Sequence, residues 1–424
     1  MNQNARQVTS RERVRAALNH ESPDRTPVDF GATGITGISA SFIYKLRREL
    51  GLPEKPIKIF CPYQMLGEVD AELRDYLGVD VVGLWPEKNL FGFDNNCTKS
   101  FMLPDGTPVL VSEQFNTDYE PDGRLFQYAR GDRSHPPSAV MPAGGWYFDT
   151  VIRQTPIDED KLNPEDNLQE SPLLTEADLR GTQDAISMLY ANTDYALIGG
   201  TAATALGDIA LVPGPMLPEP KGIRDIEEWY MSLVLRPDYV REVFAQQTER
   251  ALSNLKLYYE AVGNKIEVMV LCGTDFGSQH TLMCSVEVFR TLFLPFYKQM
   301  NDWVHANTRW KTFKHSCGAV EPLIEGFIEA GFDILNPVQC SAVGMDARTL
   351  KDKYGGRITF WGGGVDTQGT LQSGTPDDVR REVKERLSVF GPGGGFVFNT
   401  IHNTQANVPV ENFLAMIETL RNFR

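Results

Sequence analysis

The sequence predicts a (β/α)8 barrel with a β-rich insertion after the second strand. Compact apolar runs recur along the chain, and most are followed by a turn and then a helical pattern. Strands that alternate with helices are typical of parallel βαβ units, and eight such units close into a barrel. The expected strands are residues 27–31, 80–85, 195–200, 265–272, 311–315, 333–338, 357–362 and 396–401.

A helix is expected before the first strand. Thr9 or Ser10 can cap its N-terminus, because a side-chain oxygen at that position accepts from the first free backbone N–H groups. Val14, Ala17 and Leu18 fall on one face at helical spacing. The first strand follows directly after a short turn.

Three connecting helices are clear in the second half of the chain, over residues 285–307, 319–331 and 375–390. Pro295 stands inside the first of them and is expected to kink it, because proline removes a backbone donor. Thr375 is a typical cap for the third, and the residue after it is a proline, which fits the first turn of a helix.

The insertion accounts for the length of the chain. A barrel of this type needs about 250 residues, and this sequence has 424. We expect one barrel domain over residues 1–424, with residues 86–190 forming a β-rich cap segment over its top. The segment LPDGTPV is a hairpin-like turn signal. The cap either shapes a substrate pocket or forms a subdomain or oligomer contact, and a homo-oligomer is compatible with the sequence.

The composition excludes several classes of function. The net charge of −15 argues against nonspecific binding to nucleic acid or to an anionic membrane. No apolar stretch approaches the roughly 20 residues that span a membrane, and the polar N-terminus has no signal-peptide pattern. Six cysteines are too few for a disulfide framework in a chain of this size. A cytoplasmic protein with reduced thiols is therefore expected.

Polar residues follow the ends of five predicted strands. Active sites of these barrels lie at the C-terminal ends of the strands, so these residues are the candidate site. In chain order they are Asp275, His315, Cys317, Gln339, Cys340, Asp366, His402, Asn403 and Gln405.

A metal site is the chemistry that this set favours. Zinc prefers Cys and His ligands, and a catalytic zinc keeps three protein ligands and one open position. The single residue between His315 and Cys317 lets both side chains leave a strand end on the same side. Cys340 follows one βα unit later, which suits a barrel rather than a zinc finger. Buried packing is the alternative for the cysteines, and His402 is either a ligand, a proton donor or a substrate partner.

Other catalytic motifs are missing from the sequence. The segment GPGGGF lacks the Lys and Ser/Thr of a phosphate-binding P-loop and precedes a strand. No GxSxG or HExxH pattern occurs. Nucleophile-elbow hydrolases and zincin proteases are therefore not favoured.

Four stretches together resemble the uroporphyrinogen decarboxylase superfamily. They are SRERVRAALNHESPDRTPVDF, KHSCGAVEPLIEGFIEAGFDILNPVQ, ITFWGGGVDTQGTL and IHNTQANVPVENFLAM. The resemblance runs over nearly the whole chain and is weakest in the 86–190 segment. It implies the barrel fold that the strand pattern predicts.

The resemblance points to one branch of that superfamily. The metal-free decarboxylases carry an arginine-rich N-terminal motif, whereas residues 29–39 here read DFGATGITGIS, without arginine. A highly anionic porphyrinogen needs cations, so it is not an expected substrate. The corrinoid-linked methyltransferases carry an HxC pair and a later Cys as zinc ligands. His315 and Cys317 match the pair, and Cys340 is the expected third ligand.

The resemblance implies a zinc-dependent methyltransferase. It would move a methyl group between a small methyl ether or thiol and a corrinoid that a partner protein carries. His402 and Asp275 are the expected catalytic residues, with His402 as a fourth ligand or nearby acid. Gln339, Asp366, Asn403 and Gln405 are expected to bind substrate. Three alternatives stay open: a metal-free decarboxylase or lyase of a non-porphyrin carboxylate, a non-catalytic relative, and other metal chemistry such as zinc hydrolysis.

Overall fold

Seven parallel strands form one curled sheet in the computed structural model, which describes residues 7–423. The strand order is β14-β13-β12-β11-β10-β9-β3, so the strands of this sheet follow one another around it in chain order. The bounds are β3 (Val81–Gly83), β9 (Ala196–Gly200), β10 (Val268–Cys272), β11 (Lys311–His315), β12 (Ile334–Asn336), β13 (Thr359–Trp361) and β14 (Phe396–Val397).

An eighth extended segment closes this sheet into a barrel. Val28 forms a parallel bridge with Phe398, just beyond β14. The backbone N–H of Asp29 donates to the Phe398 carbonyl at 2.9 Å, and that of Asp80 donates to the Val28 carbonyl at 2.8 Å. The segment therefore lies between β14 and β3. The eight predicted strands all overlap the strands of this barrel, which confirms the predicted fold class.

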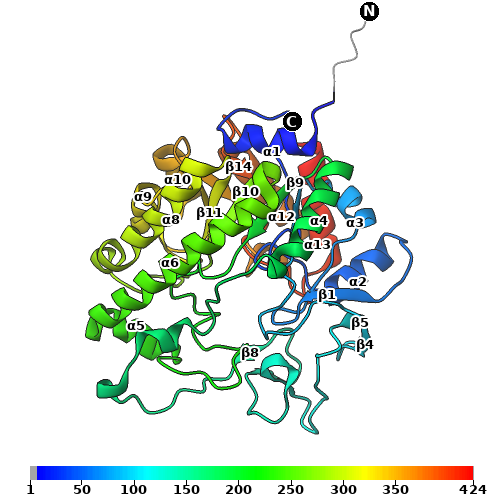
Figure 1. Ribbon diagram of the computed structural model, residues 1–424. Helices are drawn as coiled ribbons and strands as arrows, with labels where there is room; N and C mark the ends of the chain where they lie inside the picture. Colours follow the sequence, from blue (N-terminus) through cyan, green and yellow to red (C-terminus); the bar gives the residue numbers. More distant parts are fainter. Residues whose placement is uncertain (1–6, 424) are drawn as a thin grey trace, which may run out of the picture.

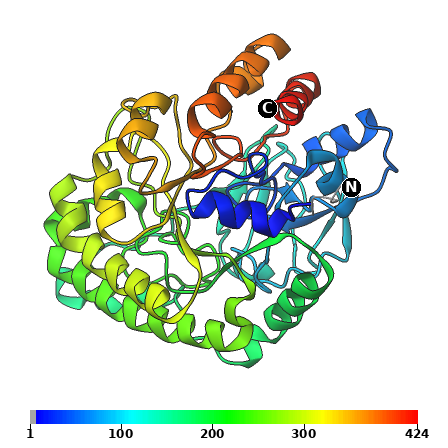
Figure 2. The same ribbon diagram turned by 90° about the horizontal axis from the view of Figure 1, so that it is seen from above.

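The barrel interior is filled by side chains and covered at its N-terminal end by helix α1 (Ser10–Leu18). Val14 and Leu18 of α1 pack on buried side chains that the strands point inward. Thr9 and Glu12 form a capping box at the start of α1, as the sequence predicts for a cap at this position. Figure 2 shows α1 crossing the middle of the ring of helices. The inward-pointing residues are Val81, Ala196, Ile198, Val268, Phe313, Ile334, Trp361 and Val397.

Helices surround the barrel (Figure 1). Their bounds are α2 (Ala40–Glu49), α3 (Ala71–Leu77), α4 (Arg180–Asn192), α5 (Ile226–Leu235), α6 (Pro237–Val262), α7 (Val286–Val288), α8 (Leu294–Asn307), α9 (Glu321–Glu329), α10 (Ala347–Tyr354), α11 (Thr370–Ser373), α12 (Pro376–Phe390) and α13 (Val410–Asn422). None of the helices between residues 7 and 423 combines the length and the apolarity that a membrane crossing requires.

The helix predicted over residues 285–307 is interrupted. One π-helical turn, Phe289–Phe293, separates α7 from α8, and Pro295 lies in the first turn of α8. Proline has no backbone N–H to donate, so a wider turn before it keeps the helix axis continuous without that hydrogen bond. The interruption takes this form rather than a simple end of the helix.

The insertion contains two small sheets. β4 (Lys99–Met102) and β5 (Pro108–Val111) form the hairpin predicted at LPDGTPV. β6 (Leu125–Gln127), β7 (Ala139–Met141) and β8 (Asp149–Thr150) form a three-stranded antiparallel sheet. In Figure 1 these strands lie at the opposite end of the molecule from α1, which is the C-terminal end of the barrel strands.

The insertion differs from the prediction in two ways. β1 (Ile57–Cys61) and β2 (Leu66–Gly67), which precede the second barrel strand, join β5 and β4 in one sheet of order β2-β1-β5-β4. Residues 151–192 contain no strand; they form three short 3₁₀ helices and α4. Four phenylalanines of the insertion are fully buried and form ring contacts that build a core: Phe91, Phe93, Phe115 and Phe148.

Candidate metal centre at the mouth of the barrel

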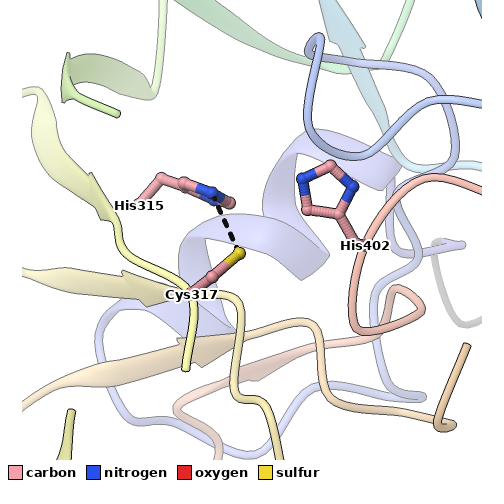
Figure 3. A group of neighbouring side chains, drawn as sticks. All are labelled: His315, Cys317 and His402. Atoms are coloured by element: carbon pink, nitrogen blue, oxygen red, sulfur yellow. Dashed lines mark hydrogen bonds between the residues drawn. The ribbon is translucent and has the colours of Figure 1, made fainter. Parts of the chain in front are cut away.

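Three potential metal ligands converge at the C-terminal end of the barrel. The donor atoms of His315, Cys317 and His402 all lie within 4.8 Å of one another. His315 ends β11 and Cys317 follows it, whereas His402 lies in the loop after β14. In Figure 3, His315 and Cys317 point from one side, and His402 from the other, into the same space. The sulfur of Cys317 lies 3.5 Å from Nε2 of His315.

The loop that carries Cys317 is held by backbone hydrogen bonds. The N–H of Cys317 donates to Oδ1 of Asp275 at 2.6 Å, and the N–H of Gly318 donates to Oε1 of Gln339 at 2.8 Å. Gly318 has a positive φ of 87°, and a Cβ there would come within 2.3 Å of the Gly277 carbonyl oxygen. Only glycine allows this close approach, so the chain turns sharply just after the candidate ligand.

The ring of His315 is oriented by an amide. Nδ1 of His315 lies 2.6 Å from Oδ1 of Asn336, and Nδ2 of Asn336 donates to the Trp361 carbonyl at 2.8 Å. The second bond fixes the amide so that its oxygen faces the imidazole. Nδ1 must then carry the proton, which leaves Nε2 of His315 free to bind a metal.

Burial makes all three candidate ligands neutral. Burial lowers the pKa of His315. Burial also lowers the pKa of His402, to about 4, and the neighbouring imidazole of His315 adds to this shift. Burial and the nearby Asp275 carboxylate raise the pKa of the Cys317 thiol well above its usual range. The site thus offers two neutral imidazoles and one thiol. A cation that binds there displaces the thiol proton, which makes binding stronger as the pH rises.

Cys340 is not part of this group. It lies in the turn after β12, half-buried, and the charged side chains that act on its thiol include Arg386 and Glu382 of α12. Burial raises the pKa of this thiol to about 12. The sequence hypothesis had Cys340 as the third ligand and His402 as a fourth ligand or nearby acid, and of these two the structure brings His402 to the other candidate ligands.

The remaining predicted site residues have different surroundings. Gln339 contacts the Cys317 loop and also donates to Oε1 of Gln279 at 2.8 Å. Asp366 accepts from the backbone of its own turn, at Gln368 and Gly369. Asn403 binds a loop after the first strand, since it accepts from the N–H of Gly37 and donates to the Gly34 carbonyl. Gln405 is half-buried in the same loop as Asn403. Their part in substrate binding stays a prediction.

The sequence reasoning missed two polar residues near Asp275. Asp208 lies in the loop after β9, where burial, with the like charge of Asp275, raises its pKa to about 6. The hydroxyl of Tyr230, on α5, donates to the backbone carbonyl of Asp275 at 2.7 Å. Asp208 lies eight residues after the end of a predicted strand. The sequence argument considered only polar residues close to strand ends, and so it did not include Asp208.

A cavity of about 440 Å³ lies away from these residues. It is lined by residues of β3, α3 and α4, among them Val82, Arg74 and Leu189, and by none of the three candidate ligands. The cluster of potential metal ligands lies instead at the barrel mouth, where the loops after the strands meet. The chemistry of the side chains is the stronger indicator of function.

The fold and the site define a (β/α)8 barrel with a group of potential metal ligands at the C-terminal ends of its strands. A family profile described as "Uroporphyrinogen decarboxylase (URO-D)" matches residues 141–423. The chain therefore belongs to the uroporphyrinogen decarboxylase family.

Individual relatives are distant. The uroporphyrinogen decarboxylase of Coxiella burnetii (strain RSA 493 / Nine Mile phase I) is 32% identical over 88 residues, which cover 20% of this chain and 24% of the relative. That of Psychromonas ingrahamii is 31% identical over 85 residues, 19% of this chain and 23% of the relative. The matched stretch thus spans about a quarter of each relative. A solved structure described as a methyltransferase from Methanosarcina mazei is similar over 98% of this chain and 99% of its own, with a TM-score of 0.55 and 16% identity. That similarity shows a shared fold.

Proposed function

We propose that this protein is a zinc-dependent methyltransferase that moves a methyl group between a small methyl ether or thiol and a corrinoid. The observation that carries the proposal is the convergence of His315, Cys317 and His402 at the barrel mouth. The likeness in fold to a methyltransferase from Methanosarcina mazei over nearly the whole of both chains supports it.

The residues fit zinc on three grounds. Two imidazoles and one thiol are the ligand types that zinc prefers, and three protein ligands leave the fourth tetrahedral position open for a substrate. The amide of Asn336 orients His315 from behind, as the outer partners of metal ligands do. His402, rather than Cys340, is the third ligand in this proposal.

Zinc bound there would act as a Lewis acid on the heteroatom that carries or receives the methyl group. The protein's own side chains would orient the substrate and move protons. Cleavage of a methyl ether breaks the C–O bond and leaves the electron pair on the oxygen, so that oxygen needs a proton from the protein. A bound corrinoid would supply the acceptor for the methyl group. Asp208, whose pKa is about 6, is a suitable donor of that proton near neutral pH.

Asp275 has a fixed place in this site. Oδ1 of Asp275 accepts a hydrogen bond from the backbone N–H of Cys317. The same oxygen lies 3.6 Å from Nε2 of His315. The backbone carbonyl of Asp275 accepts from Tyr230. We assign Asp275 to keeping the His315–Cys317 pair in register and to accepting a proton from a thiol substrate. The corrinoid would reach the mouth on a partner protein.

A metal-free decarboxylase of a non-porphyrin carboxylate is the second candidate, because the chain belongs to a family whose named members are decarboxylases. Asp275 or Asp366 would then act as the acid. A porphyrinogen substrate is disfavoured, because Asp208 and Asp275 lie at the mouth and residues 29–39 contain no arginine to bind its carboxylates.

Metal content distinguishes these candidates. Elemental analysis would be made on protein purified without added metal or affinity tag, as wild type and as the variants Cys317→Ser, His402→Gln and Cys340→Ser. We expect about one zinc per chain in the wild type and in Cys340→Ser, and little in the other two.

Two other outcomes would change the assignment. Loss of zinc in Cys340→Ser with retention in His402→Gln would restore Cys340 as the third ligand. Absence of zinc from all four proteins would reject the zinc-dependent methyltransferase and favour the decarboxylase. With zinc present, the transfer itself is followed by the change in visible absorption between methylated and reduced corrinoid.

A further inference from the structure

Lys314 is a fully buried lysine directly before the candidate ligand His315. Its ammonium donates to the backbone carbonyl of Thr274 at 2.6 Å and to that of His315. The sulfur of Cys272 lies 3.5 Å away. No carboxylate of residues 7–423 forms an ion pair with it. The Asp208 carboxyl acts on it only at longer range. A buried charge without a close partner is costly, so other groups must compensate it.

Aromatic rings supply part of that compensation. The ammonium lies 4.8 Å from the ring centre of Phe276, 5.6 Å from that of Phe327 and 5.9 Å from that of Tyr297. A cation over aromatic faces is stabilised, and more so when water is excluded. The three rings come from the loop after β10, from α9 and from α8. One side chain thereby joins the barrel wall to two outer helices.

The carbonyl partners connect this lysine to the metal centre. Thr274 immediately precedes Asp275, and the other carbonyl belongs to His315 itself. The pairing of β10 with β11 is irregular between Val270 and Cys272, so the ends of these strands are not set by regular sheet hydrogen bonds alone. An irregularity of this kind re-aims the side chains that follow it. The ammonium holds both strand ends where regular pairing stops.

We propose that Lys314 is a positioning residue for the metal centre. By holding the carbonyls of Thr274 and His315, its ammonium fixes Asp275 on one strand end against the His315–Cys317 pair on the next. Lys314 contacts neither the metal nor the substrate in this role. The inference rests on the proposed function, because it takes His315 and Cys317 as metal ligands.

The test compares two lysine-to-methionine variants. Lys314→Met removes the charge and the donors but keeps an unbranched side chain of similar length. Lys351→Met is the matched control, because Lys351 also donates to two backbone carbonyls, those of Phe390 and Gly394, and lies near the start of β14 at the opposite end of the barrel. Lys314→Arg keeps the charge and the hydrogen-bond donors. It is the variant to compare with wild type if Lys314→Met does not fold.

Cobalt(II) binding gives the first measurement. We expect Lys314→Met to raise the dissociation constant for Co(II) by about tenfold or more. Loss of an outer partner of a metal ligand has an effect of this size. The visible absorption of bound Co(II), which reports ligand geometry, should also change. Lys351→Met should leave both unchanged, and Lys314→Arg should fall between wild type and Lys314→Met. Wild-type affinity and spectrum in Lys314→Met would overturn the proposal.

Hydrogen exchange of the metal-free proteins gives the second measurement. Lys314→Met should speed amide exchange in residues 272–277 and 315–318, and Lys351→Met should not. Should the wild type bind no Co(II), the proposed function fails, and exchange alone decides the role of Lys314. Unchanged exchange in both segments would then reject it.

Discussion

Asn336 holds the imidazole of His315 by a 2.6 Å hydrogen bond between Oδ1 and Nδ1. The amide belongs to β12 and the imidazole to β11, so the bond runs between neighbouring strands of the barrel wall. It decides which nitrogen of His315 faces Cys317. The metal-binding capacity of this ring therefore depends on a residue that would not itself touch the metal.

Replacing Asn336 with alanine should weaken zinc binding about 10- to 100-fold, because His315 loses the partner that fixes its tautomer and direction. A competition titration with a chromophoric chelator measures this. Asn301→Ala is the control, since Asn301 is another buried amide, which donates to the Ala330 carbonyl away from the site. Equal zinc affinity in the two variants would contradict the prediction.

Gly318→Ala should lower the free energy of unfolding by about 2–4 kcal/mol and also weaken metal binding. A positive φ and a contact with the Gly277 carbonyl both oppose a Cβ at this position. Gly393→Ala separates the two causes, because Gly393 has a similar φ of 78° but no atom within 4 Å of the added Cβ. We expect Gly393→Ala to lower the free energy of unfolding by only about 1–2 kcal/mol. Urea unfolding measures both variants.

Asp80→Ala should destabilise the protein by about 3–5 kcal/mol without changing zinc stoichiometry. The carboxylate of Asp80 is fully buried and pairs with Arg13 and Arg25, each at 2.7 Å. Removing it leaves the buried guanidinium of Arg13 with only the partly exposed Asp24 as a partner, and leaves the buried N–H of Val28 without its acceptor. Asp24→Ala, which removes an exposed partner of Arg13, should cost about 0–1 kcal/mol. Zinc lost from folded Asp80→Ala would show that this end of the barrel influences the mouth.

The buried carboxyl of Asp29 should make stability fall as the pH rises. Burial raises its pKa from 3.8 to about 6, although Trp361 and the N–H of Ala32 donate to it. The folded protein holds this proton more tightly than the unfolded chain does. The contribution to stability is therefore complete below about pH 4 and is lost as the pH rises through 6.

The Asp29→Asn variant isolates this contribution. The difference in unfolding free energy, wild type minus variant, should fall by about 2–3 kcal/mol between pH 4 and pH 7. Urea unfolding at a series of pH values measures it. A constant difference across this range would show that folding does not raise the pKa of Asp29.

The barrel could be predicted because its strands are short, apolar and buried on both faces, so each leaves a local signal in the sequence. The insertion could be predicted only in part. The hairpin of β4 and β5 follows from the turn residues between them, but the pairing of β5 with β1 joins segments about 50 residues apart. No local pattern encodes that contact.

The site shows the same division between local and long-range information. His315 and Cys317 lie two residues apart at a strand end, so their proximity is a local property. Whether Cys340 or His402 joins them depends on the paths of two separate loops. The roles of Asn336 and Lys314 depend on which neighbouring groups their polar atoms reach, which residue type alone does not reveal.

The cap over the mouth is not a module that can be exchanged by cutting at its apparent boundaries. Its four-stranded sheet takes β1 and β2 from a stretch that the chain completes before it enters the second barrel strand. Excising residues 86–190 would strip β5 from β1 and leave an unpaired strand edge, which invites aggregation. Any transplant of this cap to another barrel, to change what its mouth accepts, must carry residues 57–67 along with it.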